Sequence, residues 1–564
     1  MACWRGSSTR SPSSTARPSR PEAEAPMTTQ EEVLVTGDIV TMDRDRPRAQ
    51  ALAVRGGRIV AVGTLDEARA ALGPAPREVR YGEGTVVPGL IDTHNHMQWT
   101  AIQTRLVDLA PARSIADVQE AVRAYAQRNP DKPWIMSGSG WHVVSLREGR
   151  YPTRQELDAV CADRPVYLPR VGHAAVANTL ALKMAGIARE TPDPPGGRFE
   201  REPDGHPNGV LLEPSAFEQV ARLVPPLSLE EQADALREMQ RAYHAAGLTG
   251  IMDPGISPEM MRLYQLLWRR GELTIRSVVM PLADSSLPLE VNLASITHAW
   301  PTTGFGDARL KLGGVKLFLD GGASLGTALM REPYPDERCN CGIQVTPTES
   351  FRQIAWACAK QGWSLGVHVV GGKAIDIALE VFAEIDQEIP LKPLRFSLIH
   401  AYLWPEARNI REAARMGITV ATQCSMQYTF GPLLVKRFGT ALMATATPVR
   451  SWIDGGVVVG GGSDSPVTPY QPLLGLWQAR TRHIAGTDEP VGRLQAVSGE
   501  EALALYTRDA AYVSFSEHER GVLRPGLLAD WTVLSVDPVT CDPEALRGAR
   551  VLATAVDGRV VHEA

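Results

Sequence analysis

His94 and His96 stand two positions apart at the end of an apolar run, and imidazole is a common ligand of zinc and other transition metals. Residues i and i+2 of a β-strand point to the same side, so these two side chains could hold one ion between them. The pair alone is weak support, because 12 histidines in 564 residues give about 0.25 such pairs by chance. The pair indicates a metal site only if further residues of metal-ligand type lie near it.

Further residues of metal-ligand type close other apolar runs that are far away in the sequence. They are His368, His400, Asp464, and the pair Lys316 and Asp320 in the run GVKLFLDG. A lone histidine at a strand end is more often a hydrogen-bonded core residue, by about two to one, but these side chains together supply a full set of ligands. The alternative interpretation of Lys316 is a side chain that snorkels from an apolar strand, although burial of an unmodified ammonium is costly. Asp320 is the alternative anionic ligand and a candidate substrate contact.

The elements that must position these residues repeat along the chain. A helical run closes at a glycine, and a short apolar strand follows at once, as at Gly247, Gly362 and Gly417. The helix before Gly247 is predicted to begin with a capping box of Ser228 and Glu231. Eight strands are predicted, beginning near residues 86, 248, 276, 314, 364, 395, 418 and 457. Eight parallel strands predict an α/β fold with a (β/α)8 TIM-like barrel, whose active site lies at the carboxyl ends of its strands.

The two ends of the chain and one long internal segment do not belong to this repeat. Residues 31–87 and 517–564 are rich in short β-runs with Gly56-Gly57 and Asp557-Gly558 as hairpin turns, which predicts a small composite β-sandwich domain. Residues 88–516 form the predicted barrel domain, and about 97–226 form an insertion after its first strand. Residues 1–30 are predicted to be a disordered extension. Translation from Met27, or an organelle transit peptide, are open alternatives.

Composition limits the classes of partner. A net charge of −6 with 22% charged residues gives no reason to expect nucleic acid or anionic lipid, so a small-molecule substrate is expected. We expect no membrane span, because no run of about 18 apolar residues occurs. Seven scattered cysteines favour a reducing cytoplasm over a disulfide-stapled secreted protein. A homo-oligomer is left open.

Several motifs resemble a known family. The segment VPGLIDTHNH (residues 87–96) resembles the first metal motif of the amidohydrolase superfamily, and the order His-x-His, Lys, His, His, Asp is similar to that family's ligand order. The segments VGHAAVANTLAL, KLFLDGGASLGTALMREPY, GGSDSPVTP and LRPGLLADWTVLSVDP are similar to the amidohydrolase 3 (YtcJ-like) branch, which includes N-substituted formamide deformylases. The resemblance covers about residues 33–563.

The resemblance implies hydrolysis of an amide or related C–N bond, other than a peptide bond, at one or two divalent ions, usually zinc. It implies that Lys316 is carboxylated by CO2 and bridges the ions, with His94, His96 and Asp464 on the first and His368 and His400 on the second. Such ions polarise a carbonyl and acidify water. Asp464 is the expected general base, and His400 and His173 are further candidate catalytic residues. Esterase, lactonase or deaminase activity, or a barrel that has lost catalysis, are the alternatives.

Three residues of the insertion are candidate substrate contacts. Arg170 and His173 resemble the branch's insertion motif, where they could bind substrate or stabilise an oxyanion, with ordinary loop hydrogen bonding as an equal alternative. Trp141 could line the pocket or pack in the core of the insertion. The chain departs from the branch's usual pattern after His368 and at Ile399 and Gly326, which leaves the substrate open.

Overall fold

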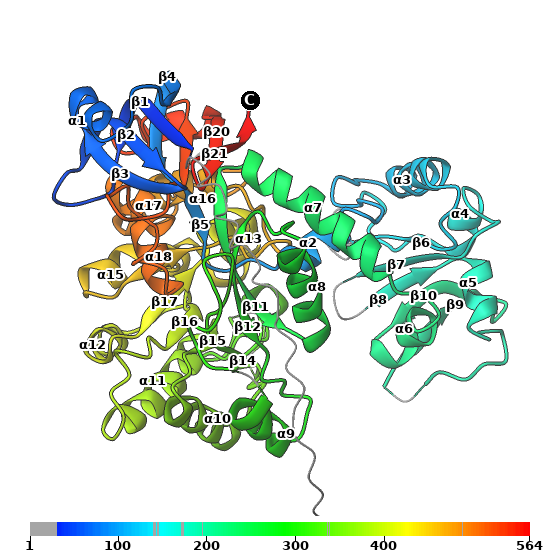
Figure 1. Cartoon of the computed structure of the whole chain (residues 1–564). Coiled ribbons are helices and arrows are strands. Elements are labelled where there is room, and N and C mark those ends of the chain that lie inside the picture. Colours follow the sequence, from blue (N-terminus) through cyan, green and yellow to red (C-terminus); the bar gives the residue numbers. More distant parts are fainter. Residues whose placement is uncertain are drawn as a thin grey trace, which may run out of the picture.

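The computed structural model describes residues 31–564, apart from 139, 140, 142, 144, 145, 171–173, 195, 300, 336, 338 and 488. The predicted extension (residues 1–30) lies outside the described residues, and so does His173. Figure 1 shows three parts: parallel strands surrounded by helices, a sheet that both chain ends build, and a smaller α/β insertion. In the described part, no helix is both long and apolar enough to cross a membrane.

Two parallel sheets form the centre, with strand orders β13-β12-β11-β5 and β14-β15-β16-β17-β18. Their bounds are β5 (Leu90–Asp92), β11 (Leu248–Ile256), β12 (Arg276–Pro281), β13 (Leu310–Leu312), β14 (Val315–Phe318), β15 (Leu365–Val369), β16 (Ser397–His400), β17 (Thr419–Thr422) and β18 (Val459–Gly461). Nearly all their side chains are buried, which accounts for the almost continuous apolar runs. Strands therefore occur at all eight predicted places. The first begins later than predicted, at Leu90, because the chain up to Pro88 pairs in the terminal sheet.

The fourth predicted strand is divided at Gly313-Gly314. Its first half, β13, pairs with β12, and its second half, β14, pairs with β15. Gly314 has φ +149°, and a Cβ atom there would lie 2.9 Å from the Ser364 carbonyl oxygen, so this crossing requires glycine. Backbone hydrogen bonds join the two sheets on either side, among them those from Ala283 N to Lys316 O at 2.8 Å and from Thr93 N to Gly461 O at 3.0 Å.

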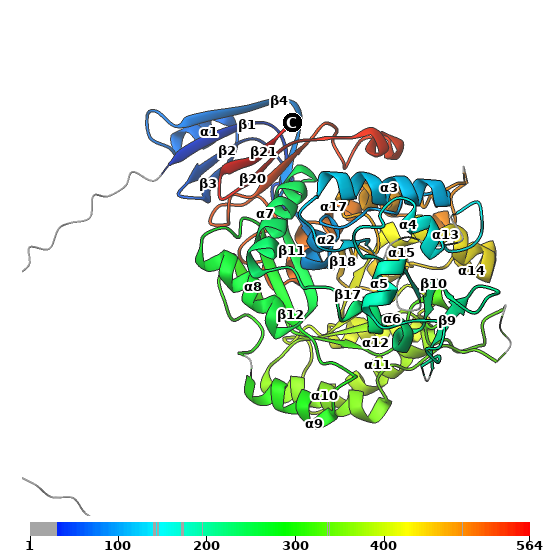
Figure 2. The same cartoon turned by 90° about the vertical axis from the view of Figure 1, so that its right-hand side faces the viewer.

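Helices cover the outside of the parallel strands (Figures 1 and 2). They are α2 (Met97–Gln103), α7 (Leu229–Ala245), α8 (Pro258–Arg269), α9 (Leu289–Ala294), α10 (Thr348–Gln361), α11 (Gly372–Asp386), α12 (Ala407–Met416), α13 (Cys424–Phe438), α14 (Thr440–Met443), α15 (Val449–Asp454), α16 (Pro472–Thr481), α17 (Gly499–Leu505) and α18 (Arg508–Val513). The predicted capping box of Ser228 and Glu231 at the start of α7 is confirmed. Gly247, Gly362 and Gly417 follow their helices with φ between +69° and +88°, the left-handed conformation expected of helix-ending glycines.

Both ends of the chain contribute to one seven-stranded sheet, ordered β21-β20-β19-β4-β1-β2-β3. Its strands are β1 (Glu32–Val40), β2 (Arg48–Arg55), β3 (Arg58–Gly63), β4 (Arg77–Pro88), β19 (Trp531–Leu534), β20 (Val551–Val556) and β21 (Arg559–Glu563), with α1 (Leu65–Ala70) packed on β2 and β3. The predicted turns at Gly56-Gly57 and Asp557-Gly558 are confirmed, and all four residues have positive φ. Trp531 is fully buried in the core of this sheet.

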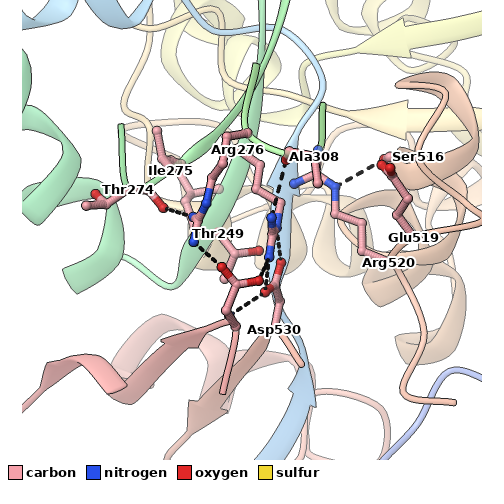
Figure 3. Close-up of polar contacts among 12 residues, drawn as sticks. Thr249, Thr274, Ile275, Arg276, Ala308, Ser516, Glu519, Arg520 and Asp530 are labelled. Carbon is pink, nitrogen blue, oxygen red and sulfur yellow. Dashed lines mark hydrogen bonds and ion pairs between the residues drawn. The ribbon is translucent and has the colours of Figure 1, made fainter. Parts of the chain in front are cut away.

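A buried ion pair joins this sheet to the amino ends of the parallel strands (Figure 3). Arg276, the first residue of β12, donates from Nε and Nη2 to the two carboxylate oxygens of Asp530, at 2.6 and 2.8 Å. Their side chains are only 3% and 2% exposed. Asp557 also accepts from Arg276, and the neighbouring Arg520 donates from Nε to Ser516 Oγ at 3.1 Å. The two-bond geometry fixes direction as well as distance, so it orients one unit on the other.

The insertion carries its own sheet, ordered β6-β7-β8-β10-β9. Its elements are α3 (Ile115–Arg128), β6 (Ile135–Met136), α4 (Arg154–Asp158), β7 (Val166–Arg170), β8 (Ala174–Ala177), α5 (Thr179–Met184), β9 (Arg198–Arg201), β10 (Pro207–Leu212) and α6 (Pro214–Ala221). Two separate apolar clusters fill it, so it has a core of its own.

Candidate metal centre

The predicted ligand residues meet at the carboxyl ends of the parallel strands. Ligand atoms of His94, His400 and Asp464 all lie within 4.8 Å of one another. Asp464 Oδ1 is 3.1 Å from Nε2 of both His94 and His96. The His368 ring centroid is 4.5 Å from that of His400. Four imidazoles and one carboxylate from four different strand ends therefore form a single cluster.

Asp92 fixes the loop that carries the first two histidines. Its buried carboxylate accepts hydrogen bonds from the backbone N–H groups of His94 and Ser463, from the Asn95 amide and from the Ser463 hydroxyl. Asp464 N in turn donates to His94 O at 2.6 Å, and Asp464 itself has φ +58°. The loops after β5 and β18 are thus tied together, and the Asp464 side chain is turned toward the histidines.

His400 is oriented by a neighbour on the next strand. Its Nδ1 lies 2.6 Å from Gln423 Oε1, while the Gln423 amide nitrogen donates to Ala421 O at 3.1 Å. Because that second bond directs the amide oxygen toward the ring, His400 Nδ1 carries the proton and Nε2 keeps its lone pair. The ring is therefore in the tautomer that a metal ligand needs.

The charges in the cluster favour an ionised Asp464. Burial opposes ionisation, but His94 and His96 outweigh it and hold the pKa of Asp464 well below its usual range. Burial would also lower the pKa of His96, yet Asp253 and Asp464 raise it to about 9. Burial lowers the pKa of His94 to about 4, so that ring is neutral at physiological pH.

Lys316 lies inside this cluster without a hydrogen-bond partner. The side chain is 1% exposed, and its Nζ finds no hydrogen-bond acceptor among the described residues. Nζ stands 4.7 Å from the centroid of the Phe318 ring. Burial lowers the pKa of Lys316 to about 7, against the opposing pull of Asp464 and Asp320. A large fraction of this amine is therefore neutral near pH 7.

The residues present fit a divalent metal ion. Besides Lys316 Nζ, the buried Nδ1 atoms of His94 and His368 lack hydrogen-bond partners in the described part of the chain. Buried polar atoms without partners are rare, and several in one cluster indicate a missing bonding group. Imidazole nitrogen with carboxylate oxygen is a donor set that suits zinc and its neighbours among the transition metals.

Asp320 is held by backbone N–H groups of two neighbouring loops. Its carboxylate accepts three backbone N–H bonds, from Leu329, Val370 and Gly371, each at 2.9 Å. Asp320 Oδ1 also lies 3.7 Å from His368 Nε2. The side chain therefore holds the loops after β14 and β15 together, next to the candidate ligand His368.

The three candidate residues of the insertion differ in what the structure shows of them. Trp141 is 5% exposed in one of the insertion's apolar clusters, and its indole N–H donates to Pro169 O at 2.9 Å. That packing favours the interpretation of Trp141 as a core residue. Arg170 is half-buried at the end of β7, opposite Ala174. His173 lies outside the described residues, so its role stays a prediction.

Sequence reasoning missed three residues beside the cluster. Asp253 and Gln423 contact His96 and His400, and both close apolar runs, LTGIMD and ITVATQ, so the rule that selected the ligands would also have selected them. Trp99 is 57% exposed, with its ring 5.3 Å from that of His96. No pattern in the sequence distinguishes it from a surface tryptophan.

Parallel strands with outer helices and a histidine and aspartate cluster at their carboxyl ends define a metal-centred α/β enzyme. A model of the amidohydrolase family matches residues 82–562. The chain belongs to the amidohydrolase family and is a hydrolase that acts on carbon–nitrogen bonds.

Similarity to individual proteins supports this family assignment. The chain is 30% identical to the N-substituted formamide deformylase of Arthrobacter pascens, over 94% of this chain and 98% of that protein. It is 29% identical to the putative amidohydrolase YtcJ of Bacillus subtilis, over 93% and 98% of the two chains. An uncharacterised metal-dependent hydrolase of Pyrococcus horikoshii has the same fold, with a TM-score of 0.74, 23% identity, and coverage of 91% of this chain and 99% of the other.

Proposed function

We propose that this enzyme hydrolyses an amide or related C–N bond, other than a peptide bond, in a small molecule at a zinc centre. The observation that carries the proposal is the cluster of four histidines, Asp464 and Lys316 at the carboxyl ends of the parallel strands, where Lys316 Nζ has no hydrogen-bond partner among the described residues. We also infer that the two parallel sheets are parts of one (β/α)8 barrel.

His94, His96 and Asp464 would hold one ion, and His368 and His400 a second. Bound there, such ions polarise a substrate carbonyl and lower the pKa of a water molecule. Lys316 fits a bridging role once carboxylated: its neutral amine adds to CO2, releases one proton and becomes an anionic carbamate. The low pKa of about 7 supports this step, because the neutral amine is the reacting form.

Asp464 is the group that moves protons. Its carboxylate is ionised at neutral pH and lies between His94 and His96, so it can accept a proton from the attacking water. The same oxygen then returns the proton to the leaving nitrogen, which departs as a neutral amine. His400, whose Nε2 keeps its lone pair, is proposed to act by holding the second ion beside the reacting carbonyl, and His173 is the group proposed to stabilise the oxyanion.

Trp99 supports a substrate with an apolar substituent. An indole more than half exposed beside His96 offers a flat apolar surface next to the reacting centre. The formamide deformylase relative acts, by its name, on N-substituted formamides. We therefore propose an N-substituted amide, with Arg170 among the candidate contacts. The free thiols of the six described cysteines support a reducing, cytoplasmic location.

The test combines metal analysis with a substrate panel. We expect one to two divalent ions per chain, and turnover of at least one member among N-substituted formamides, N-acyl amines, esters and lactones. Asp464→Asn should keep the fold and most of the metal but lower kcat by roughly 100-fold or more. Fewer than about 0.2 ions per chain after growth with zinc or manganese would contradict the proposal, and an Asp464→Asn variant of near-normal activity would remove Asp464 from this role.

A further inference from the structure

Asp253 lies at the same edge of the fold as the ligand histidines. It sits near the carboxyl end of β11, which runs parallel to β5 with Ile251 opposite Asp92. The pairing of β11 with β12 shifts by one residue just after Asp253, where Gly255 has φ +84°. Bulges of this kind re-aim side chains beside active sites.

The two carboxylate oxygens of Asp253 have different surroundings. The residue is fully buried, and its Oδ2 accepts a hydrogen bond of 2.6 Å from the Tyr264 hydroxyl. Oδ1 lies 3.6 Å from His96 Nδ1 and has no hydrogen-bond partner among the described residues. A fully buried carboxylate oxygen without a partner is costly, so its persistence needs an explanation.

His96 supplies that explanation, because its ring stands between two carboxylates. Nε2 faces Asp464 Oδ1 at 3.1 Å, on the side of the cluster, and Nδ1 faces Asp253 on the other side. Nε2 can bind an ion only when the ring proton sits on Nδ1. The 3.6 Å contact exceeds the usual N–H···O limit by about 0.4 Å, a gap that a small ring rotation closes.

We propose that Asp253 is the positioning residue for His96, and that Tyr264 in turn orients Asp253. Asp253 accepts a hydrogen bond from the Nδ1–H group of His96, fixes the ring and keeps Nε2 available, so that it controls how tightly the centre retains a divalent ion. The inference rests on the proposed function in requiring an ion at the site.

The position of Tyr264 allows it to orient Asp253. It lies on the buried face of α8 and is itself fully buried, so its hydroxyl is held in place by the packing of that helix. Because the Tyr264 hydroxyl holds Oδ2, the carboxylate is turned so that Oδ1 is the oxygen facing His96. Helix α8 thus fixes Tyr264, Tyr264 orients Asp253, and Asp253 orients His96, which would bind the ion.

The experiment measures zinc affinity by competition with a chromophoric chelator, together with the Tm of the zinc-free protein. Asp253→Asn should bind zinc about 10- to 100-fold more weakly than the wild type, the usual effect of removing such an outer partner. Tyr264→Phe should weaken binding by a smaller factor. The matched control is Tyr334→Phe, which removes an equally buried hydroxyl that donates to Ala328 O at 2.9 Å, and it should leave zinc affinity unchanged.

A purely structural role has a different signature, since it lowers the Tm of the zinc-free protein and leaves zinc affinity as it was. Zinc affinity within about threefold of wild type in Asp253→Asn therefore overturns the inference. If that variant does not fold, Tyr264→Phe decides, and an affinity equal to wild type overturns it. Should the wild type bind no zinc, the proposed function fails and this inference falls with it.

Discussion

Lys316 and Asp320 lie in the same apolar run, and the sequence offers both as candidates for the bridging metal ligand. Their surroundings in the structure favour Lys316. Asp320 is saturated by three backbone N–H donors, whereas Lys316 Nζ is buried in the described structure with no hydrogen-bond acceptor. A carboxylate already bound by three donors has little capacity left for a bridging position. The neutral form of the Lys316 amine, by contrast, keeps its lone pair available for reaction.

Lys316→Ala is therefore expected to lose metal and activity. A short carboxylic acid such as acetate or propionate should restore part of both, because it can replace the missing carbamate. The measurement is elemental analysis and turnover of the purified variant with and without the added acid.

Asp320→Asn is the matched control for Lys316→Ala. It should retain at least one ion but lower the Tm, because a neutral amide is a weaker acceptor for three backbone donors. The assignment of the bridging ligand would be wrong if Lys316→Ala bound two ions normally while Asp320→Asn bound none.

The two ends of the parallel strands have different roles: one end carries the candidate site, and the other carries contacts that stabilise the fold. Their carboxyl ends carry the cluster, and their amino ends carry Arg276, whose guanidinium is held by Asp530 from the terminal sheet (Figure 3). Burial raises the pKa of Asp530, but Arg276 outweighs it, and the net pKa is lowered. The terminal sheet is thus fixed to the amino end of β12, which lies in the same parallel sheet as β5, the strand that leads into His94 and His96.

Asp530→Asn should destabilise the fold by roughly 3 kcal/mol, since it leaves a buried arginine without its main countercharge. A carboxyl with a lowered folded pKa stabilises the fold above its unfolded pKa of about 3.9, and that contribution is lost as pH falls through the folded value. The Tm gap between wild type and Asp530→Asn, measured by scanning calorimetry, should therefore shrink below about pH 4.

Asp38→Asn is the control for an exposed pair. Asp38 lies 3.3 Å from Arg48, and both side chains are at least 40% exposed, so the change should cost less than about 1 kcal/mol. Equal costs for the two variants, or a gap that widens in acid, would contradict the role given to the Arg276 and Asp530 pair.

The proposed metal ligands span residues 94 to 464, so one ion would cross-link strand ends that are hundreds of residues apart. Binding to the folded state alone stabilises it by mass action, by about 4 kcal/mol at a thousand times Kd. Removal of metal with a chelator should lower the Tm, by roughly 5 °C in a chain of this size, and zinc should restore it. His94→Ala, which lacks a ligand atom, should respond less. An equal response in this variant would mean that zinc acts elsewhere.

The sequence by itself determined the places of the strands, several helix ends and the set of candidate ligand residues. Those features depend on local causes: apolar runs, a capping box at Ser228 and Glu231, glycines at positive φ, and polar residues that close a strand. The family motifs added the expected order of ligands. The start of the first barrel strand was misplaced, because Val87 and Leu90 belong to different sheets although only two residues separate them.

Only the tertiary structure decided which side chains meet. The contact of Asp253 with His96, the hydrogen bonds of Asp92 with Ser463, and the packing of Trp141 in the insertion all join segments that lie far apart along the chain. The division at Gly314 depends on the approach of Ser364, fifty residues later. Such contacts follow from how strands and helices pack in space, and a pattern of neighbouring residues carries no record of that packing.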